Sequence, residues 1–512
     1  MLPLVLPHPR PLSYEERGRS PFPHREGGKG VRLSIHSTTD LSNTLIRIPP
    51  PPRRVQPLEV KQMPKHLLVI GGGSVGVHAA VEAAKLGADV TLISEGELGG
   101  RTTWDSLVPS KVLLTAADTV LDARYAPYRG VQLASPEVNV ADLMERIRQR
   151  THQWGEMQKQ ALQRAGVQVV HGVASFVSPH TVKVQTEEGE QQVSFDVAII
   201  ATGSVPIFPP SMKPDGKRIL APRFASSLPS LPEHLVMVGG GVTGSEFAYL
   251  FRVLGSQVTV VTDMPRLLPR ADEEASQLLE HAFRQMGIKV LLSSPVEGVT
   301  AAGSEVQVQL ADGSTLESSH AFIAIGRRAD LSRLNMEVTG MPSTPQGIPL
   351  NEYLQSPIPH IYAVGDAAGP PFTLNRGWAQ AQVAVRHALG LPTPPFRAEL
   401  VVEAVYTQPQ VAQVGMTERQ ARQQGIAVRT HRAEYADNLK AQLLGETEGF
   451  VKLMVEESTG KLLGGSAAGS HAADILAPLA LAMALGATVE MVASLYPAHP
   501  TLMELLHEAA RG

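Results

Sequence analysis

The feature that most constrains the fold is a glycine-rich unit that occurs twice in the chain. Its first copy reads HLLVIGGGSVGVHAAVEAAKLGADVTLISEGE. A strand over residues 67–70 leads into Gly71-x-Gly73-x-x-Gly76, which is followed by an Ala-rich helix, a second strand and Glu95. The first glycine permits a tight turn, the second lets the backbone approach a pyrophosphate, and the third lets the helix pack on the strand. Phosphate charge then lies at a helix N-terminus, where free N–H groups favour anions.

The second copy, HLVMVGGGVTGSEFAYLFRVLGSQVTVVTD, contains Gly239-x-Gly241-x-x-Gly244 and closes in Asp263. In both copies the acid stands 24 residues beyond the first glycine (71 to 95, 239 to 263). Two dinucleotide units in one chain indicate FAD together with NAD(P), and hence hydride transfer between a nicotinamide and a flavin. The alternative is a duplication that does not bind nucleotides.

Composition restricts the chemistry that this chain can perform. Its 512 residues are 43% apolar and carry a formal net charge of -4, which is typical of a soluble globular protein and gives no electrostatic footprint for nucleic acid. The chain has no cysteine. Disulfides, Cys-ligated metal centres and thiol nucleophiles are therefore excluded, and we predict no metal site. No uncharged apolar run reaches the length of a membrane span, so we expect a cytoplasmic protein.

Residues 1–63 differ from the remainder. Pro and Arg recur in PHPRPLSYEERGR and IRIPPPPRR, and no apolar periodicity persists for more than a few residues. Such a segment cannot bury enough apolar surface to offset the entropy of ordering it. Two interpretations remain open: a disordered tail, or an over-extended gene start with Met63 as the true first residue.

The segment over residues 98–111, LGGRTTWDSLVPSK, follows the first nucleotide unit. It resembles the active-site segment of the pyridine nucleotide–disulfide oxidoreductases (lipoamide dehydrogenase, glutathione reductase, mercuric reductase), which reads GG-x-C-x-x-x-x-C-x-P-x-K. In that family the two cysteines form the redox disulfide. Thr102 and Leu107 stand in their places here. The resemblance therefore implies a member without its dithiol relay, since neither residue exchanges with a disulfide.

Shorter motifs match the same family in order, from residue 64 to the C-terminus. They include Ala201-Thr202-Gly203-Ser204, where the family's chain leaves the FAD domain, and the AIGRR turn over residues 324–328, where it returns. The resemblance implies an α/β fold with two Rossmann-like dinucleotide-binding domains and an α+β C-terminal dimerisation domain. The expected boundaries are 64–205 and 325–395 for a split FAD domain, 206–324 for the NAD(P) domain inserted in it, and 396–512 for the dimerisation domain.

The family match assigns roles to two charged pairs. It places Lys111 near flavin N5, paired with Glu246 on the helix of the second unit, so that the cation stabilises anionic reduced flavin and the carboxylate compensates its charge. HPTLME matches the family's HPTxxE, in which Glu504 orients His499 for acid/base work in the active site of the other subunit. That role implies a homodimer. The alternative for His499 is a packed histidine near a helix start, because no dithiol remains to exchange protons with it. The alternative for Lys111 is a solvated surface cation, which is what an isolated lysine in a Pro-Ser-Lys turn ordinarily is.

The resemblance also assigns the cofactor contacts. The expected FAD contacts are Gly71, Gly73, Ser74, Gly76, Glu95, Lys111, Gly172, Thr202, Gly203, Ser204 and Asp366, the last of which lies in IYAVGDAAG. The expected NAD(P) contacts are Gly239, Gly241, Gly244, Asp263 and Gly326.

Two departures from the family affect these contacts. Counted residue by residue, the family's ribose acid falls at Ser94 and Thr262, one place before the acids of this chain, and neighbours in a strand face opposite ways. At Asp263, NADP-specific members carry an arginine, which favours NADH here, although the nearby Arg266 and Arg270 keep NADPH open. Arg101 replaces the threonine that normally follows the paired glycines.

The sequence therefore predicts an FAD-dependent NAD(P)H oxidoreductase that passes electrons from reduced flavin directly to a quinone or dye. Trp104 and Leu107 would make the acceptor pocket more apolar, which suits a flat quinone. Two rival hypotheses remain open. One is a catalytically idle dimer that keeps FAD as a scaffold, and the other is a disulfide or metal reductase that uses the thiols of a partner protein.

Overall fold

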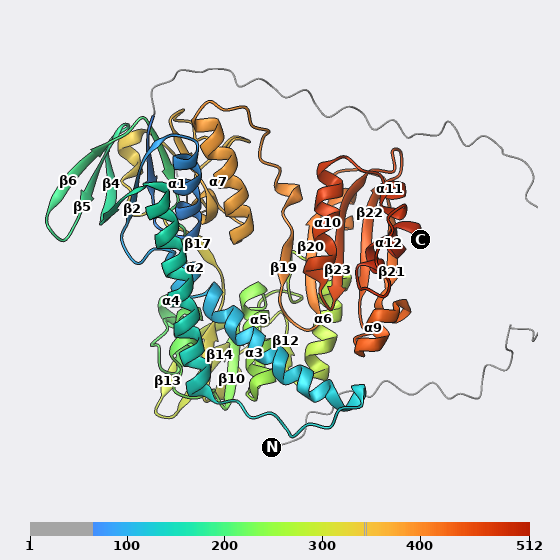
Figure 1. The fold of residues 1–512 in the computed structure, drawn as a ribbon. Coiled ribbons are helices and arrows are strands. Elements are labelled where there is room, and N and C mark those ends of the chain that lie inside the picture. Colours follow the sequence, from blue (N-terminus) through green and yellow to red (C-terminus); the bar gives the residue numbers. More distant parts are fainter. Residues whose placement is uncertain (1–64, 343, 345) are drawn as a thin grey trace, which may run out of the picture. The chain divides into compact units, whose positions relative to one another are not determined.

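The structure, a computed structural model, describes residues 65–342, 344 and 346–512 (Figure 1). The prediction for residues 1–63 lies outside this range. Among the helices within the described residues, not one combines the length and apolarity needed to cross a bilayer.

A parallel sheet carries the first glycine-rich turn, with strand order β18-β7-β1-β2-β3. Its central strand is wholly buried over Leu67, Leu68 and Val69, as expected of a parallel sheet that is covered on both faces. Helices α1 and α7 are far apart in sequence but pack side by side (Figure 1). The strands are β1 (His66–Ile70), β2 (Asp89–Ser94), β3 (Gln168–His171), β7 (Val197–Ile200) and β18 (Ile361–Ala363). The helices are α1 (Ser74–Lys85), α2 (Gly100–Trp104), α3 (Leu107–Tyr125), α4 (Val140–Ala165) and α7 (Leu374–Ala388), and an antiparallel sheet contains β4 (Val173–Ser178), β5 (Thr181–Gln185) and β6 (Glu190–Ser194).

The second unit repeats this architecture with strand order β12-β11-β10-β16-β9. The register repeats too, because His66 pairs with Asp89 in the first sheet and His234 pairs with Gln257 in the second. The strands are β9 (Ile219–Leu220), β10 (His234–Val238), β11 (Gln257–Val261), β12 (Lys289–Leu291) and β16 (His320–Ile323). The helices are α5 (Val242–Leu254) and α6 (Glu273–Gln285), and an antiparallel sheet contains β13 (Val296–Ala302), β14 (Glu305–Leu310) and β15 (Thr315–Ser318).

Two short antiparallel strands join these units. β8 (Ser204–Pro206) pairs with β17 (Arg327–Ala329), so that the chain leaves the first unit and returns to it through adjacent segments. These are the two turns that the sequence singled out as the exit and the return.

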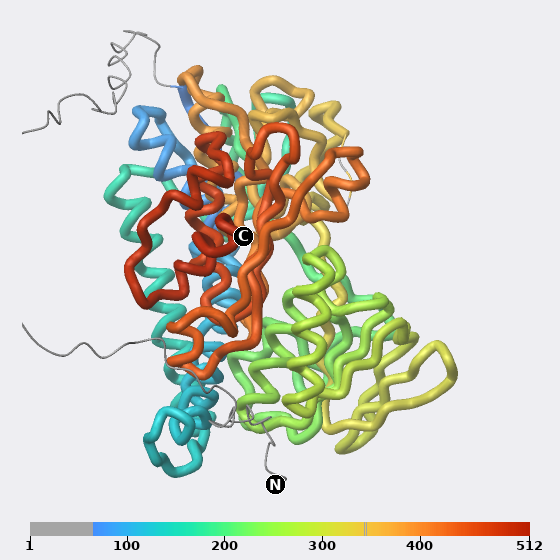
Figure 2. Tube along the Cα trace, turned by 90° about the vertical axis from the view of Figure 1, so that its right-hand side faces the viewer, coloured from blue at the N-terminus to red at the C-terminus, as the bar shows by residue number. Residues whose placement is uncertain are grey.

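The C-terminal region is an antiparallel sheet with helices, in strand order β19-β20-β23-β22-β21. Figure 2 shows the course of this region in orange and red. Its buried Lys452 pairs at 2.8 Å with Asp272, the N-cap of α6 in the second unit. The strands are β19 (Glu403–Val405), β20 (Gln410–Gly415), β21 (Val428–Glu434), β22 (Phe450–Glu456) and β23 (Leu462–Gly469). The helices are α8 (Glu418–Gln423), α9 (Leu439–Leu444), α10 (Ala472–Ala484), α11 (Val489–Ala493) and α12 (Glu504–Arg511). The fold class predicted from the sequence is confirmed.

Candidate active site

Both glycine-rich turns have the same geometry. Gly71 has φ of 116°, and a Cβ added there would lie 2.4 Å from the carbonyl oxygen of Ala201. A Cβ added to Gly76 would lie 1.9 Å from the carbonyl oxygen of Gly71. The second turn repeats both values: Gly239 has φ of 116°, and a Cβ on Gly244 would lie 1.9 Å from the oxygen of Gly239. The first and third glycines are therefore required by the turn itself.

The middle glycine of each motif faces open space instead. Among the described residues, no atom lies within 4 Å of a Cβ added to Gly73 or to Gly241. Gly73 also lines a cavity of about 1270 Å³, which is larger than an ordinary small-ligand pocket. A bare backbone that faces so large a cavity fits the close approach of a dinucleotide pyrophosphate.

That cavity brings most of the predicted FAD residues together. The predicted residues that line it are Gly71, Gly73, Ser74, Glu95, Lys111, Gly172, Thr202, Gly203, Ser204 and Asp366. Gly76 is not part of this lining. The predicted NAD(P) residues are not part of it either; they are Gly239, Gly241, Gly244, Asp263 and Gly326. The second unit reaches the cavity through Val242, Thr243 and Glu246 at the start of α5.

The ion pair predicted between the two units is present. Lys111 Nζ, on α3, donates to both carboxylate oxygens of Glu246, on α5, at 2.9 and 2.8 Å. The Glu246 side chain is 8% exposed and that of Lys111 34% exposed. Tyr406, just after β19, completes the arrangement. Its backbone N–H donates to Glu246 Oε1 at 3.0 Å, and its ring centroid lies 4.4 Å from Lys111 Nζ.

A second charged cluster surrounds Asp366. Arg101 Nη2 donates to Asp366 Oδ2 at 3.1 Å, and the hydroxyl of Ser204 donates to the same oxygen. Arg327 donates in turn to the Ser204 hydroxyl at 2.9 Å and to the Ser204 carbonyl at 2.6 Å. Burial lowers the pKa of Arg101, and the charge of Asp366 opposes that shift.

Three residues in the cavity lining each have a buried polar atom that, within the described residues, lacks a hydrogen-bond partner. These atoms are Arg101 Nη1, Thr202 Oγ1 and Thr373 Oγ1. Buried polar groups in proteins almost always have partners. These groups, the open backbone of Gly73 and the charged cluster at Asp366 together fit a flavin dinucleotide.

The two family cysteine positions face this cavity, since Thr102 and Leu107 both line it. Trp104 holds the loop between them. Its indole N–H donates to the Leu98 carbonyl at 3.0 Å, and its ring packs so closely on Gly155 that a Cβ there would lie 2.5 Å away. The loop therefore keeps a fixed shape without sulfur.

The acids after the second strand of each unit lie at the surface, as the one-residue offset indicated. Ser94 is buried beneath the turn and donates to the Gly96 carbonyl at 2.8 Å. Glu95 lies at the cavity rim, where both of its oxygens accept from Arg333, and those hydrogen bonds lower the pKa of Glu95. In the second unit Thr262 is buried and Asp263 is exposed.

His499 and Glu504 are paired but lie apart from the cavity. His499 Nδ1 lies 2.8 Å from Glu504 Oε1, and Thr501 N–H donates to Glu504 Oε2 at 2.8 Å. The Thr501 N–H and then His499 lower the pKa of Glu504. The His499 side chain is 64% exposed, and neither residue lines the cavity. The role of this pair in the active site of the other protomer stays a prediction.

Sequence reasoning missed much of the cavity lining, including Asp118, Tyr406 and Arg333. Asp118 accepts a hydrogen bond from Tyr249 at 3.0 Å, and burial raises its pKa. It lies seven residues after Lys111 on α3, so helical spacing was an available signal. Tyr406 and Arg333 come from distant segments, and no local pattern marks either one.

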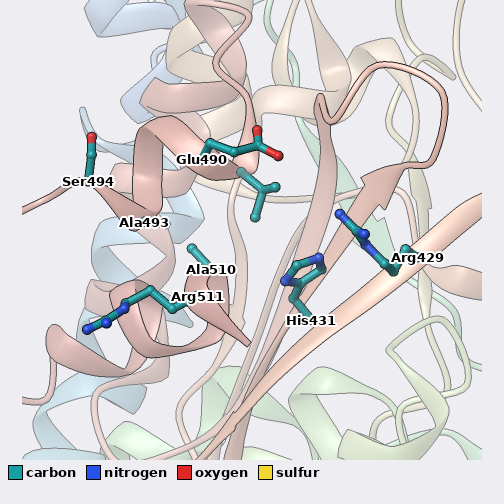
Figure 3. Close-up of a pocket in the computed structure, with 8 residues that line it drawn as sticks. Arg429, His431, Glu490, Ala493, Ser494, Ala510 and Arg511 are labelled. Atoms are coloured by element: carbon teal, nitrogen blue, oxygen red, sulfur yellow. The ribbon is translucent and has the colours of Figure 1, made fainter.

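A second, smaller hollow of about 400 Å³ lies on the C-terminal region (Figure 3). It is lined by Arg429 and His431 of β21, Glu490 of α11 and Arg511 of α12. In Figure 3 the guanidinium of Arg511 points away from His431 and Arg429, so these basic groups do not converge.

Comparisons with known proteins identify the family of this chain. The family profile described as pyridine nucleotide-disulphide oxidoreductase matches residues 52–100 and 65–388, and the profile of its dimerisation domain matches residues 401–510. A dihydrolipoyl dehydrogenase of Bacillus subtilis is 35% identical, over 86% of this chain and 97% of the relative. An NAD(P)H dehydrogenase (quinone) of Mycobacterium tuberculosis is 31% identical, over 88% and 94%. The crystal structure of LpdA from Mycobacterium tuberculosis superposes with a TM-score of 0.83 at 31% identity, over 87% of this chain and 99% of that one. This chain, without a single cysteine, belongs to the pyridine nucleotide–disulfide oxidoreductase family.

Proposed function

We propose that the protein is an FAD-dependent NAD(P)H oxidoreductase that delivers electrons directly to a non-disulfide acceptor such as a quinone or dye. The family uses FAD and NAD(P)H. The observation that carries the proposal is the pairing of Lys111 with Glu246 in a cavity whose two redox positions are Thr102 and Leu107. The groups suited to flavin reduction are retained, and the groups needed for dithiol exchange are replaced.

When bound, FAD would take a hydride from the nicotinamide and pass two electrons to the acceptor. Lys111 would place a positive charge where negative charge develops on reduction, and Glu246 would hold that ammonium in one position. Trp104 and Leu107 offer apolar surface at the cavity, which favours a flat ring system. The quinone dehydrogenase among the relatives supports this class of acceptor.

NADH is the proposed nicotinamide. Arg266, a candidate for binding a 2′-phosphate, donates to the Pro269 carbonyl at 2.9 Å and pairs with Glu273 at 3.5 Å. Both terminal nitrogens of its guanidinium are therefore engaged by its own chain. Asp263 is exposed nearby and would repel a further phosphate.

A homodimer completes the proposal, supported by the match to the family's dimerisation domain. In it, His499 and Glu504 of one protomer would serve the cavity of its partner as an acid/base pair, which protonates the reduced acceptor or stabilises its negative charge. The exposure of His499 supports such a role across an interface.

Anaerobic addition of NADH to the purified flavoprotein tests this function. Bleaching of the flavin band, followed by recovery when a quinone is added, is the expected result. Steady-state turnover with quinones, dyes and lipoamide should show activity with the first two and none with lipoamide. Flavin absorbance that does not change with NADH or NADPH would support the idle scaffold instead. Lipoamide reduction only after a thiol-bearing partner protein is added would support the reductase with borrowed thiols.

A further inference from the structure

Arg101 is a partly buried cation in a cavity that is rich in acidic side chains. The lining contains eight carboxylates and four cations, which are Arg101, Lys111, Arg327 and Arg333. A dinucleotide brings two further negative charges on its diphosphate, so the binding of FAD there depends on which cation is available to it.

Three of these cations are already engaged within the described residues. Lys111 donates to both oxygens of Glu246, Arg333 to both oxygens of Glu95, and Arg327 to the hydroxyl and carbonyl of Ser204. Arg101 differs from them. Its Nη2 donates a hydrogen bond to Asp366, but its Nη1 is buried and has no acceptor among the described residues. A buried donor left in that state destabilises the fold, and a ligand atom that accepts its hydrogen bond would remove that cost.

The position of Arg101 identifies the part of the ligand that it would contact. Arg101 directly follows Gly99 and Gly100 at the start of α2. The backbone of Gly99 bridges that of Gly73, and a Cβ on Gly100 would lie 2.9 Å from the Gly73 Cα. Gly73 is the glycine whose open backbone lets a pyrophosphate approach. The side chain thus begins beside the diphosphate position and ends at Asp366.

We propose that Arg101 binds the FAD diphosphate through Nη1 while Nη2 remains on Asp366. The inference rests on the proposed function in that the cavity holds FAD. A guanidinium donates to two acceptors at once in a fixed fork geometry, and its charge-assisted hydrogen bonds are about twice as strong as neutral ones. The threonine that the family carries here offers only a neutral hydroxyl. We therefore expect the affinity of this chain for FAD to depend more strongly on ionic strength than the affinity of a family member that has threonine at this position.

Titration of the full-length chain, freed of flavin, with FAD at low and at high salt tests the proposal through flavin fluorescence. Arg101→Met should weaken binding by about 10- to 100-fold at low salt and flatten its salt dependence, the scale of a lost charged hydrogen bond. Arg101→Lys should lose less, because it keeps the charge. Inorganic pyrophosphate should displace FAD from the wild type more readily than from Arg101→Met. Arg148→Met, which removes an exposed cation outside the cavity lining, serves as the control and should alter FAD affinity less than about threefold.

A double variant separates a diphosphate contact from a purely structural partner of Asp366. If Arg101 only neutralises Asp366, Arg101→Met costs no FAD affinity when it is added to Asp366→Asn, and the proposal falls. If Arg101 binds the diphosphate, Arg101→Met weakens FAD binding relative to Asp366→Asn alone. Equal FAD affinity and salt response in wild type and Arg101→Met also overturns the inference, with FAD binding intact. Failure of the wild type to bind FAD instead overturns the proposed function. Circular dichroism of each variant confirms that it is folded.

Discussion

Lys111 Nζ lies 2.9 and 2.8 Å from the two carboxylate oxygens of Glu246, a residue 135 positions further along the chain. The pair joins α3 of the first nucleotide unit to α5 of the second at the cavity that both units line. A partly buried ammonium placed this way has a defined position before any ligand arrives. That preorganisation is what makes a fixed charge effective at a reacting centre.

Removal of the ammonium should slow flavin reduction. We expect Lys111→Ala to lower the rate of anaerobic reduction by NADH by about 100-fold, the usual scale for one preorganised charge, because Glu246 is left uncompensated beside the developing negative charge. Stopped-flow absorbance measures the rate. Lys183→Ala, which removes an exposed lysine paired with Glu190, serves as the control and should leave the rate unchanged. Unaltered quinone turnover in Lys111→Ala would show that the residue is not beside the flavin.

The ring of Tyr406 should matter more than its hydroxyl for holding Lys111. A cation–π contact contributes roughly 0.5–2 kcal/mol, so Tyr406→Leu should slow flavin reduction by about 3- to 30-fold. Tyr406→Phe keeps the ring and the backbone N–H donated to Glu246, and should remain within about twofold of wild type. The same stopped-flow assay compares them. Equal rates in both variants would contradict the contact.

The first nucleotide turn offers a pair of glycine substitutions with opposite expected effects. Gly73→Ala should fold normally but lose FAD, because its Cβ meets no described atom within 4 Å and projects into the cavity. Gly76→Ala should destabilise the fold itself, because its Cβ would lie 1.9 Å from the Gly71 carbonyl oxygen. Melting temperature and flavin content of the two purified variants measure these effects. A yellow, fully loaded Gly73→Ala protein would rule out the pyrophosphate at this turn.

The pKa of Asp118 is raised by burial, which its hydrogen bond from Tyr249 only partly opposes. The stability that this group contributes is present below its unfolded pKa of about 3.9 and is lost as the pH rises through its higher folded pKa. Asp118→Asn keeps an acceptor for Tyr249 and stays neutral. It should therefore melt about 2 °C above wild type at neutral pH, with the difference vanishing in acid. The control, Asp89→Asn at an exposed position, should show no such pH dependence.

The two half-reactions should respond differently to loss of His499. We expect His499→Asn to leave flavin reduction by NADH unchanged and to slow reoxidation by quinone by roughly tenfold or more, since a general acid contributes at least that much. Double-mixing stopped-flow experiments resolve the two steps. The control is His281→Asn, at an exposed position on α6. Reoxidation that is equally fast in His499→Asn would favour the interpretation of a packed histidine.

The features that depend only on neighbouring residues could be predicted from the sequence. The strand, Gly-x-Gly-x-x-Gly turn and helix of each unit depend on short-range sterics, and the structure repeats Gly71 and Gly239 with the same φ of 116°. The resemblance also matched Lys111 with Glu246, because each belongs to a motif of fixed spacing, and the structure brings the two side chains together.

Other contacts were not predictable, because they depend on how distant segments pack. The ring of Tyr406 reaches Lys111 only because β19 runs beside α5. Arg101 was recognised as a departure from the family, but its pairing with Asp366, 265 residues later, depends on packing between the cavity loop and the return of the chain. Pairings of this kind leave no periodicity in either segment.

The cluster of Lys111, Glu246 and Tyr406 has a consequence for biogenesis. The residues that supply its ammonium, its carboxylate and the N–H bound to that carboxylate are far apart in the chain. The last of them, Tyr406, is translated when about four-fifths of the chain has been made. A nascent polypeptide on the ribosome can form both nucleotide folds before it can close this cluster. Stable incorporation of the coenzyme would then follow emergence of residue 406, which makes flavin colour a marker of completed synthesis.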